Sequence, residues 1–361
     1  MGGIKLDKNS FFILGRPISP VYSGIMRLRS HLYSRDILRR ISLPRPVISI
    51  GNLSMGGTGK TPHVIEISRF LVKKGLKPVI LTRGYRSKAG AGPVLVRNSG
   101  PDFTPPDLVG DEPLMIAGCL SGVNVVVGSD RGKCGMWAME HLSPDIFLLD
   151  DGFQHLAVKR DLDIVLLPFD DPLSGGHVFP GGMLREPVAA LGRSDVLLLS
   201  KCPDFNGEAE ALKETVHRQV LGKPIFLSSV RPVCLTRLSD NTSHPLRSLD
   251  GAKVVGFCGI ARPDSFRSVL LKLGAELVNF VEFSDHHLYN RKDIDSILGI
   301  LSQGRADFLV TTSKDAVKLK DFLYKDKKIV QESWSKIFVL DIGIELETGF
   351  WNYMSRFLDR I

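Results

Sequence analysis

The 361-residue chain is long enough for two domains, and 43% hydrophobic with 24% charged residues is the composition of a soluble globular protein. Its formal net charge of +8 predicts an acidic partner, which nucleic acid, an anionic membrane surface or a phosphorylated substrate would satisfy. No apolar run reaches the roughly 18 residues of a spanning helix, no signal-peptide core is recognised, and the five cysteines form no C-x-x-C pair, so neither a disulfide framework nor a zinc site is expected.

The N-terminal segment, residues 1–46, is basic and amphipathic. From residue 11 onward seven arginines face a single acid, Asp36. The apolar side chains at helical spacing beside them are Val21, Ile25, Leu28 and Leu32. We expect a helix that lies on an anionic membrane, with packing on the rest of the protein as the alternative. Single-stranded nucleic acid is a weaker alternative, because only Tyr22 and Tyr33 are placed to stack on bases.

A phosphate-binding loop is predicted at Ile48–Pro62, which reads ISIGNLSMGGTGKTP. Glycines let backbone N–H groups turn towards anionic oxygens, a lysine supplies a point charge, and a threonine hydroxyl can ligate Mg²⁺. The loop is a variant of G-x-x-x-x-G-K-[ST], because Ser54 stands where the first glycine is usual. The residues expected to bind the nucleotide here are Ser54, Met55, Gly56, Gly57, Thr58, Gly59, Lys60 and Thr61.

Short apolar strands alternate with helical patterns from Val47 onward, which predicts an α/β fold: a P-loop three-layer sandwich with a mostly parallel sheet. This first domain is expected over residues 47–223. Its predicted strands are Val47–Ile50, Pro78–Thr82, Asn124–Gly128, Ile146–Leu149, Asp163–Leu167 and Val196–Ser200. A linker or β-ribbon is expected over residues 224–252, a second, smaller α/β domain over 253–343, and a C-terminal helix over 344–361.

Paired aspartates end the predicted strand in Asp145–His155, which reads DIFLLDDGFQH. Asp150 and Asp151 have the form of a Walker B element, whose carboxylates lie beside the phosphate-binding loop. Because Mg²⁺ prefers oxygen ligands, these aspartates, Thr61 and phosphate oxygens are expected to hold it. A turn without any metal is the alternative.

A second acidic pair, Asp111 and Glu112, lies in the sequence GDEP at Gly110–Pro113. Phosphoryl transfer to an alcohol needs a group that accepts the hydroxyl proton or orients the oxygen, and a carboxylate on a loop above the sheet fits that role. The start of a helix explains the same residues equally well, because Asp before Glu-Pro is favourable there. The residues alone leave both interpretations open.

Arginines follow the predicted strand ends. Arg83 and Arg131 come after the second and third strands, and Arg185 follows the glycine-containing stretch Phe179–Met183. Strand ends of a parallel sheet open on its ligand crevice, so these cations are expected to neutralise a transferring phosphate or to hold a phosphate of the acceptor. For any one of them alone, a surface ion pair is the alternative.

Adjacent histidines, His286 and His287, follow Asp285 in the sequence FSDHHLY. No third metal ligand is evident, so a polarising or base-orienting role across a domain cleft is favoured, with Asp285 fixing a tautomer. A structural role is the alternative.

Another stretch favours a different class. Leu197–Asp204, LLLSKCPD, is similar to the guanine-reading element of GTPases. The spacing from Lys201 to Asp204 is one residue too long for that element. A P-loop GTPase is therefore the alternative function, together with a membrane-bound nucleotide sensor.

Six motifs occur in order between Gly51 and His287, within a resemblance that runs from about Arg16 to Asp341: GNLSMGGTGKTP, RGY, GDEP, DDGFQH, FPGGMLREP and FSDHH. In this combination and order the chain resembles the tetraacyldisaccharide 4'-kinases, the lipid A 4'-kinases of Gram-negative bacteria. The resemblance implies two α/β domains joined by a β-ribbon and a membrane-associated N-terminal helix. It also implies transfer of phosphate from ATP, with Mg²⁺, to the 4'-hydroxyl of a tetraacylated glucosamine disaccharide 1-phosphate. The expected location is peripheral, on the cytoplasmic face of the inner membrane, with the lipid substrate and an anionic membrane surface as partners and no nucleic acid.

The resemblance also implies roles for individual residues. Asp111 is expected to be the catalytic base, assisted by His286, with His287 kept open for the same role, and Lys60 is expected to take part in catalysis. Tyr85, in the RGY motif, is expected near the nucleotide. The residues expected to contact the acceptor substrate are Glu112, Arg131, His155, Arg185 and Glu186.

Overall fold

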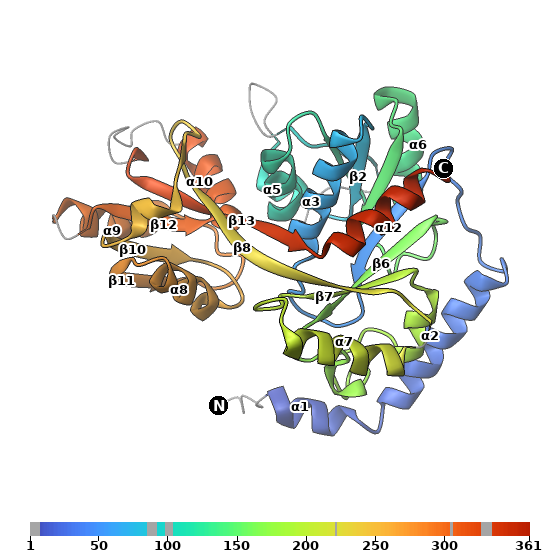
Figure 1. Ribbon diagram of the computed structural model, residues 1–361. Coiled ribbons are helices and arrows are strands. Elements are labelled where there is room, and N and C mark those ends of the chain that lie inside the picture. The colour runs from blue at the N-terminus through green and yellow to red at the C-terminus, as the bar shows by residue number, and fades with distance from the viewer. Residues whose placement is uncertain (1–7, 85–91, 98–103, 221, 304–305, 326–333) are drawn as a thin grey trace, which may run out of the picture.

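The computed structural model describes residues 8–84, 92–97, 104–220, 222–303, 306–325 and 334–361. In these ranges the chain is an α/β protein, as the sequence predicts. A 13-stranded sheet runs through it in the order β11-β10-β12-β13-β8-β7-β6-β1-β5-β2-β4-β3, and β9 is attached to β8. Figure 1 shows two units, each with helices packed on its part of this sheet.

The first unit is a mostly parallel sheet, in which the short β3 alone among its described strands pairs antiparallel, with β4. Its strands are β1 (Val47–Asn52), β2 (Pro78–Thr82), β3 (Val94–Leu95), β4 (Asn124–Val127), β5 (Ile146–Asp150), β6 (Leu162–Pro168) and β7 (Val196–Ser200). β1, β2, β5 and β7 are buried along their whole length, which is why they read as continuous apolar runs.

Helices cover both faces of this sheet. They are α3 (Lys60–Lys73), α4 (Pro106–Val109), α5 (Asp111–Cys119), α6 (Arg131–Leu142), α7 (Gly207–Gln219) and α12 (Thr348–Leu358), with short 3₁₀ turns η1 (Ser174–Gly176) and η2 (Val188–Arg193). One apolar core joins one face of the sheet to α3, α5 and α12. α6 and α7 pack on the other face, against the side chains that alternate along the strands with those of the first core. The result is the expected three-layer arrangement.

The second unit is smaller and repeats the α/β pattern. Its elements are β9 (Ser243–His244), η3 (Leu246–Leu249), β10 (Lys253–Cys258), α8 (Pro263–Lys272), β11 (Glu276–Glu282), α9 (Arg291–Ser302), β12 (Phe308–Thr312) and α10 (Ser313–Lys325). Strands β11, β10, β12 and the first part of β13 are parallel.

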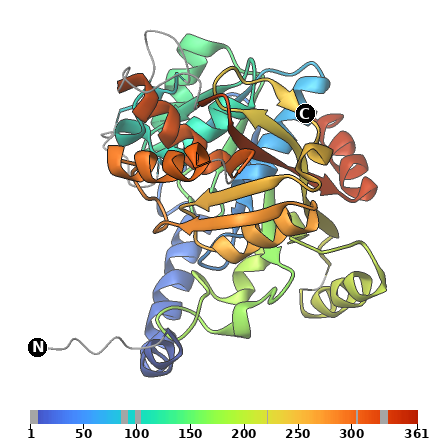
Figure 2. The ribbon, with the colours of Figure 1, turned by 90° about the vertical axis from the view of Figure 1, so that its left-hand side faces the viewer.

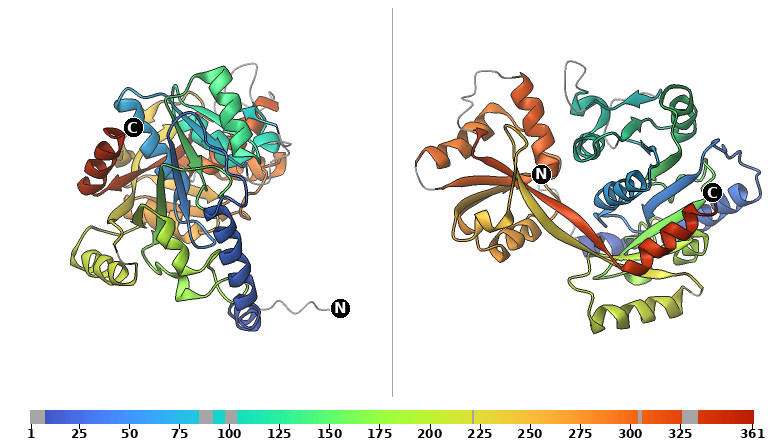
Figure 3. Two further views of the ribbon diagram at one scale, coloured as in Figure 1. Left: turned by 90° about the vertical axis from the view of Figure 1, so that its right-hand side faces the viewer. Right: turned by 45° about the horizontal axis from the view of Figure 1, so that its top comes forward.

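Two long strands, β8 (Ile225–Arg237) and β13 (Ile337–Leu346), join the units. β8 pairs with β7 in the first unit and then, antiparallel, with β13 as both cross to the second (Figure 3). β13 returns the chain to the first unit, where Trp351 of α12 stacks on Phe70 of α3 with ring centroids 4.8 Å apart. Glu345 and Leu346 still belong to β13, so the C-terminal helix begins at Thr348.

The N-terminal helices α1 (Lys8–Gly15) and α2 (Ser19–Ser34) lie along the outside of the first unit, and Figure 2 shows α1 far from the sheet. None of the residues described in α2 is buried. None of the helices in the described ranges combines the length and the apolar character needed to cross a bilayer.

The parallel pairing of β1 with β5 places the phosphate-binding loop beside the paired aspartates, because Ile50 lies opposite Asp150. Gly51 permits a close approach at this point. A Cβ atom there would lie 2.7 Å from the backbone nitrogen of Phe153 and 2.6 Å from its Cβ.

We expect Gly51→Ala to lower the free energy of unfolding by about 1–3 kcal/mol, the usual cost of overpacking, because the added methyl group meets backbone of Phe153. Urea unfolding measures the change. Gly118→Ala, on the exposed side of α5 with nothing within 4 Å of the added Cβ, is the matched control and should be neutral or stabilising. Equal unfolding midpoints for the two variants would contradict the expected clash.

Candidate active site

Charged side chains meet at the carboxyl ends of β1 and β5. Lys60, the first residue of α3, lies with Nζ 3.4 Å from Oδ1 of Asp151 and donates to Oδ1 of Asn52 at 3.1 Å. Arg185 donates from Nη1 to both oxygens of Asp151, at 3.1 and 3.0 Å. The structure therefore brings the loop lysine, one of the paired aspartates and an expected acceptor-binding arginine into one cluster.

The two neighbouring aspartates sit in different electrostatic environments. Burial, followed by the charges of Glu112 and Asp151, raises the pKa of Asp150 to about 6, although Thr82 donates to it at 3.0 Å. Burial also acts against ionisation of Asp151, but Lys60 and Arg185 outweigh it and lower the pKa of that carboxyl. Asp150 is thus a buried carboxylate with too little positive charge around it.

This donor set fits a divalent cation. Asp150, Asp151 and Thr61 offer oxygen atoms, the ligands that Mg²⁺ prefers, and a bound cation would compensate the charge of Asp150. No group of three or more His, Cys, Asp and Glu side chains in the described ranges is arranged to hold a metal by itself. The remaining ligands would come from nucleotide phosphate and water, as is usual for Mg²⁺.

His63 contacts the expected phosphate-binding loop, and it is not among the residues predicted from the sequence. His63 is fully buried, and burial lowers its pKa to about 4, so the ring is neutral. The Gly59 carbonyl can only accept, so Nδ1–H donates to it at 2.7 Å, and Nε2 accepts from Ser228 Oγ at 2.8 Å. Gly59 itself has φ +83, a conformation that favours glycine. His63 therefore fixes the loop in the shape that the following lysine requires.

Asp111 and His286 meet across the two units. Asp111 begins α5 in the first unit, and its Oδ2 lies 3.1 Å from Nδ1 of His286 in the second. Lys318 of α10 lies 3.7 Å from the same oxygen. His286 has φ +63, which costs a non-glycine residue about 1–2 kcal/mol. A strained histidine held against a carboxylate is typical of a functional site.

The structure separates the adjacent histidines. Nε2 of His287 lies 2.8 Å from Oδ2 of Asp293, and Asp293 completes the capping box at the start of α9. His287 therefore lies beside Asp293 and not beside Asp111. Asp285, expected to fix a tautomer, has Oδ2 4.0 Å from Nε2 of His286, which is beyond hydrogen-bond distance.

Arg131 and His155 are in contact with each other. Arg131 begins α6, is only 6% exposed, and lies with Nη1 3.3 Å from Nδ1 of His155. Burial and the charge of Arg131 lower the pKa of His155 to about 4, so Nδ1 accepts and the proton is on Nε2. Within the described residues that buried Nε2 finds no partner.

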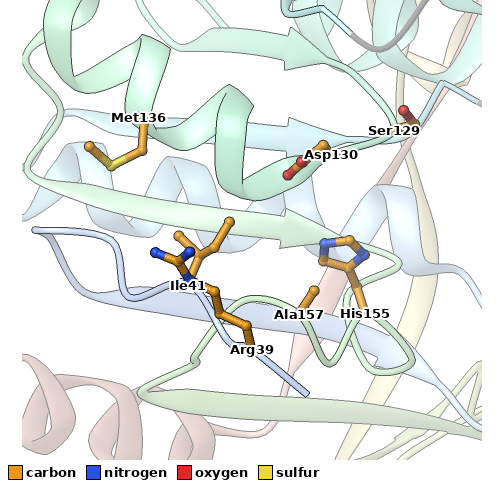
Figure 4. A pocket seen from close by; sticks show the side chains of 7 residues that line it. All are labelled: Arg39, Ile41, Ser129, Asp130, Met136, His155 and Ala157. Atoms are coloured by element: carbon orange, nitrogen blue, oxygen red, sulfur yellow. The ribbon is translucent and has the colours of Figure 1, made fainter. Parts of the chain in front are cut away.

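His155 faces a pocket of about 670 Å³, which Figure 4 shows from close by. Its other lining residues are Arg39, Ile41, Ser129, Asp130, Met136 and Ala157. Arg39, on the segment after α2, adds a cation to it. A pocket with a basic residue in its wall suits an anionic ligand.

The other expected contact residues are placed differently. Glu186 is 2% exposed and accepts from Arg193 at 2.9 Å, so in this structure it is not accessible to a ligand. Glu112 is half-buried, and its charge acts on Asp150. Tyr85 lies outside the described residues.

The expected nucleotide loop contacts two other segments of the chain, and one of them is the GTPase-like stretch. Ser54 forms a bridge with Leu184, Met55 N donates to the Met183 carbonyl at 2.7 Å, and Lys201 donates to the Gly57 carbonyl. Asp204 is instead paired with Arg231 at 3.1 Å and is 69% exposed. The lysine and aspartate of this stretch have separate partners, which does not favour the GTPase alternative.

Comparison with known proteins identifies relatives along nearly the whole chain. Residues 11–359 match the family described as tetraacyldisaccharide-1-P 4'-kinase. A tetraacyldisaccharide 4'-kinase of Desulfotalea psychrophila is 39% identical over 317 residues, 87% of this chain and 90% of the relative. One from Halothermothrix orenii is 34% identical over 352 residues, 94% and 90% of the two chains. A crystal structure of an "apo" form of LpxK from Aquifex aeolicus in complex with ATP has a TM-score of 0.74 and 32% identity, covering 94% of this chain and 97% of that one.

The raised pKa of Asp150 predicts a pH-dependent gain in stability for Asp150→Asn. Because the folded-state pKa is about 6 against 3.8, the contribution of this carboxyl to stability is fully present below pH 4 and is lost as pH rises through 6. Above pH 6 the variant should be more stable by up to about 3 kcal/mol, and near pH 4 it should match the wild type. Thermal unfolding across this pH range measures the difference.

Asp151→Asn is the contrast variant. Its carboxyl has a lowered pKa, so its stabilising contribution is present at neutral pH, and its removal should destabilise the protein there. The same sign for both variants at pH 8 would contradict the assignment of opposite environments.

Proposed function

Since the chain belongs to the tetraacyldisaccharide-1-P 4'-kinase family, we propose that it transfers the γ-phosphate of ATP to the 4'-hydroxyl of a tetraacylated glucosamine disaccharide 1-phosphate. The proposal rests on one group of neighbouring charged residues. It runs from Lys60 through Asp151 and Asp150 to the Asp111–His286 pair. Lys60 contacts Asp151, and Glu112, next to Asp111, acts electrostatically on Asp150. A phosphate-binding loop and a base for an alcohol thus share one site.

In this proposal each group has a distinct task. The phosphate-binding loop and Lys60 hold the phosphates and neutralise charge as the bond to the γ-phosphorus breaks. Asp111, held by His286, accepts the proton of the 4'-hydroxyl as that oxygen bonds to the phosphorus and ADP leaves. Asp150, Asp151 and Thr61, with phosphate oxygens, would hold Mg²⁺, which would supply further charge neutralisation. Arg185 lies where it can move from Asp151 to a phosphate oxygen.

The pocket beside His155 is the proposed subsite for the acceptor. Arg39 supplies positive charge in the pocket, and Arg131 adds charge next to His155. The unpartnered Nε2–H of His155 is buried in this structure and would have to turn into the pocket to donate to a sugar or phosphate oxygen. The pocket also contacts the segment that leads from α2, so an acceptor bound there lies near the helix with the exposed apolar side chains.

We place the protein on the cytoplasmic face of the inner membrane as a peripheral protein, with an anionic lipid surface as its partner. The support is α2, whose Val21, Ile25 and Leu28 are 64%, 54% and 58% exposed. A helix with exposed apolar side chains and two arginines, Arg27 and Arg29, suits the headgroup layer of an anionic leaflet. Such an arrangement brings a soluble nucleotide to a hydroxyl held at the lipid surface.

Asp111→Asn should lower turnover by roughly 10²–10⁴, the usual contribution of a general base, while ATP binding stays near wild type. The assay follows ³²P from γ-labelled ATP onto the lipids of an extract and then onto the purified acceptor. Asp107→Asn, an exposed acid on the preceding short helix, is the matched control. Wild-type turnover in Asp111→Asn would remove this residue from the role, and nucleotide binding without any labelled lipid would favour the sensor alternative.

Replacing two apolar residues of α2 tests the membrane contact. The double variant Ile25→Asp, Leu28→Asp should sediment with anionic vesicles at least about tenfold less, because each buried aliphatic side chain contributes about 1.5–3 kcal/mol. ATP binding should be unchanged. Val233→Asp, which alters an equally exposed apolar residue of β8, should sediment like the wild type. Equal loss in both variants would show that general surface polarity, and not α2, decides the sedimentation.

A further inference from the structure

Two lysines of α10 face the Asp111–His286 pair. Lys314 and Lys318 are four residues apart, so they lie on one side of the helix. Lys318 is buried between Asp111 and Asp315, with Nζ 3.7 and 3.1 Å from their oxygens. Lys314 is more accessible, with its side chain 20% exposed, and its Nζ lies 3.2 Å from Nε2 of His286. Neither lysine is among the residues predicted from the sequence.

The direction of the bond between Lys314 and His286 follows from the chemistry of the two groups. An ammonium group has three donors and no acceptor, so Nε2 must offer its lone pair. The proton of the neutral imidazole is then on Nδ1. From there it is donated to Oδ2 of Asp111, 3.1 Å away. A proton on Nε2 would instead point at the ammonium group.

We propose that Lys314 is a positioning residue that holds His286 in the Nδ1–H tautomer and so orients Asp111 to accept the proton of the acceptor alcohol. The reaction itself rests on the function proposed above, whereas the tautomer is a property of the protein alone. Lys314 acts through His286 and has no need to touch substrate.

The surroundings of His286 explain why a lysine is required here. Oδ2 of Asp285 lies 4.0 Å from Nε2 of His286, so a small rotation of the Asp285 side chain would let it accept a hydrogen bond from Nε2–H. Lys314 prevents this by donating both to Nε2 and, at 3.4 Å, to Oδ1 of Asp285. Without the ammonium group, the Nε2–H tautomer can bind Asp285. The lone pair of Nδ1 would then face the Asp111 carboxylate, and two acceptors cannot hold one another.

The test combines Lys314→Met, which removes the donor, with Lys314→Arg, which keeps one. Lys320→Met is the matched control on the same helix, because Lys320 donates to Asn241 at 2.7 Å, away from the pair. All are made in the full chain with ¹⁵N-labelled histidine. A His286→Asn spectrum identifies the His286 signals among those of the nine histidines.

We expect the wild type, Lys314→Arg and Lys320→Met to show His286 with Nδ1 protonated, and Lys314→Met to show protonation at Nε2. Turnover of Lys314→Met should fall about tenfold to a hundredfold, the usual effect of losing an orienting partner, with the KM for ATP within twofold of wild type. Lys314→Arg should recover most of it.

An unchanged tautomer in Lys314→Met overturns the proposal, and so does an equal loss of turnover in Lys320→Met. The spectrum needs no acceptor lipid. If the wild type labels no disaccharide lipid, the proposed function fails while the tautomer measurement still decides the role of Lys314.

Discussion

The site depends on the parallel pairing of β1 with β5. This register sets the phosphate-binding loop and the paired aspartates at one edge of the sheet, where Lys60 and Arg185 compensate Asp151 and leave Asp150 as a buried carboxylate with a raised pKa. A folded protein tolerates such a group when function requires it, and a divalent cation would remove the penalty. The sheet thus places a buried carboxylate, which a divalent cation would compensate, close to the lysine that is proposed to bind phosphate.

The second constraint is that the proposed base is assembled from both units. Asp111 comes from the first unit, whereas His286, Lys314 and Lys318 come from the second. β8 and β13 pass through both units as one antiparallel pair, whose register shifts once, between Asp341 and Ile342 (Figure 3). The relative position of the two halves is therefore set by backbone hydrogen bonding along this pair and not by a loose linker. A change in the bend of the β8–β13 pair would alter the distance between Asp111 and His286. In the proposed reaction it would thereby alter the ability of Asp111 to accept a proton.

The sequence predicts the fold class and the phosphate-binding loop because both depend on local patterns: buried apolar strands and glycines before Lys60. It could not choose between His286 and His287, since strand and turn patterns do not say which neighbour packs against α9. It also missed His63 and Lys314, whose roles depend on contacts with Ser228 and with His286, distant in the sequence. The spacing of Lys314 and Lys318 after a strand end was the available signal. Two lysines four residues apart on a helix more commonly lie on its solvent-exposed side, so this spacing alone does not predict a functional role.

The N-terminal helix connects the membrane proposal to the chemistry. Ser19 accepts a hydrogen bond from Gly181 N at 2.8 Å, and Arg29 donates to the backbone carbonyl of Gln154 at 3.2 Å. The Gln154 side chain in turn accepts from Arg185, which contacts Asp151. The side of α2 that is turned to the protein therefore contacts the loops that hold the charged cluster, while Val21, Ile25 and Leu28 remain exposed on the outer side. Three contacts, Arg29 to Gln154, Gln154 to Arg185 and Arg185 to Asp151, would connect a lipid surface on the outer side to the charged cluster. In the proposed function, one short helix would thereby serve both membrane attachment and orientation of the acceptor.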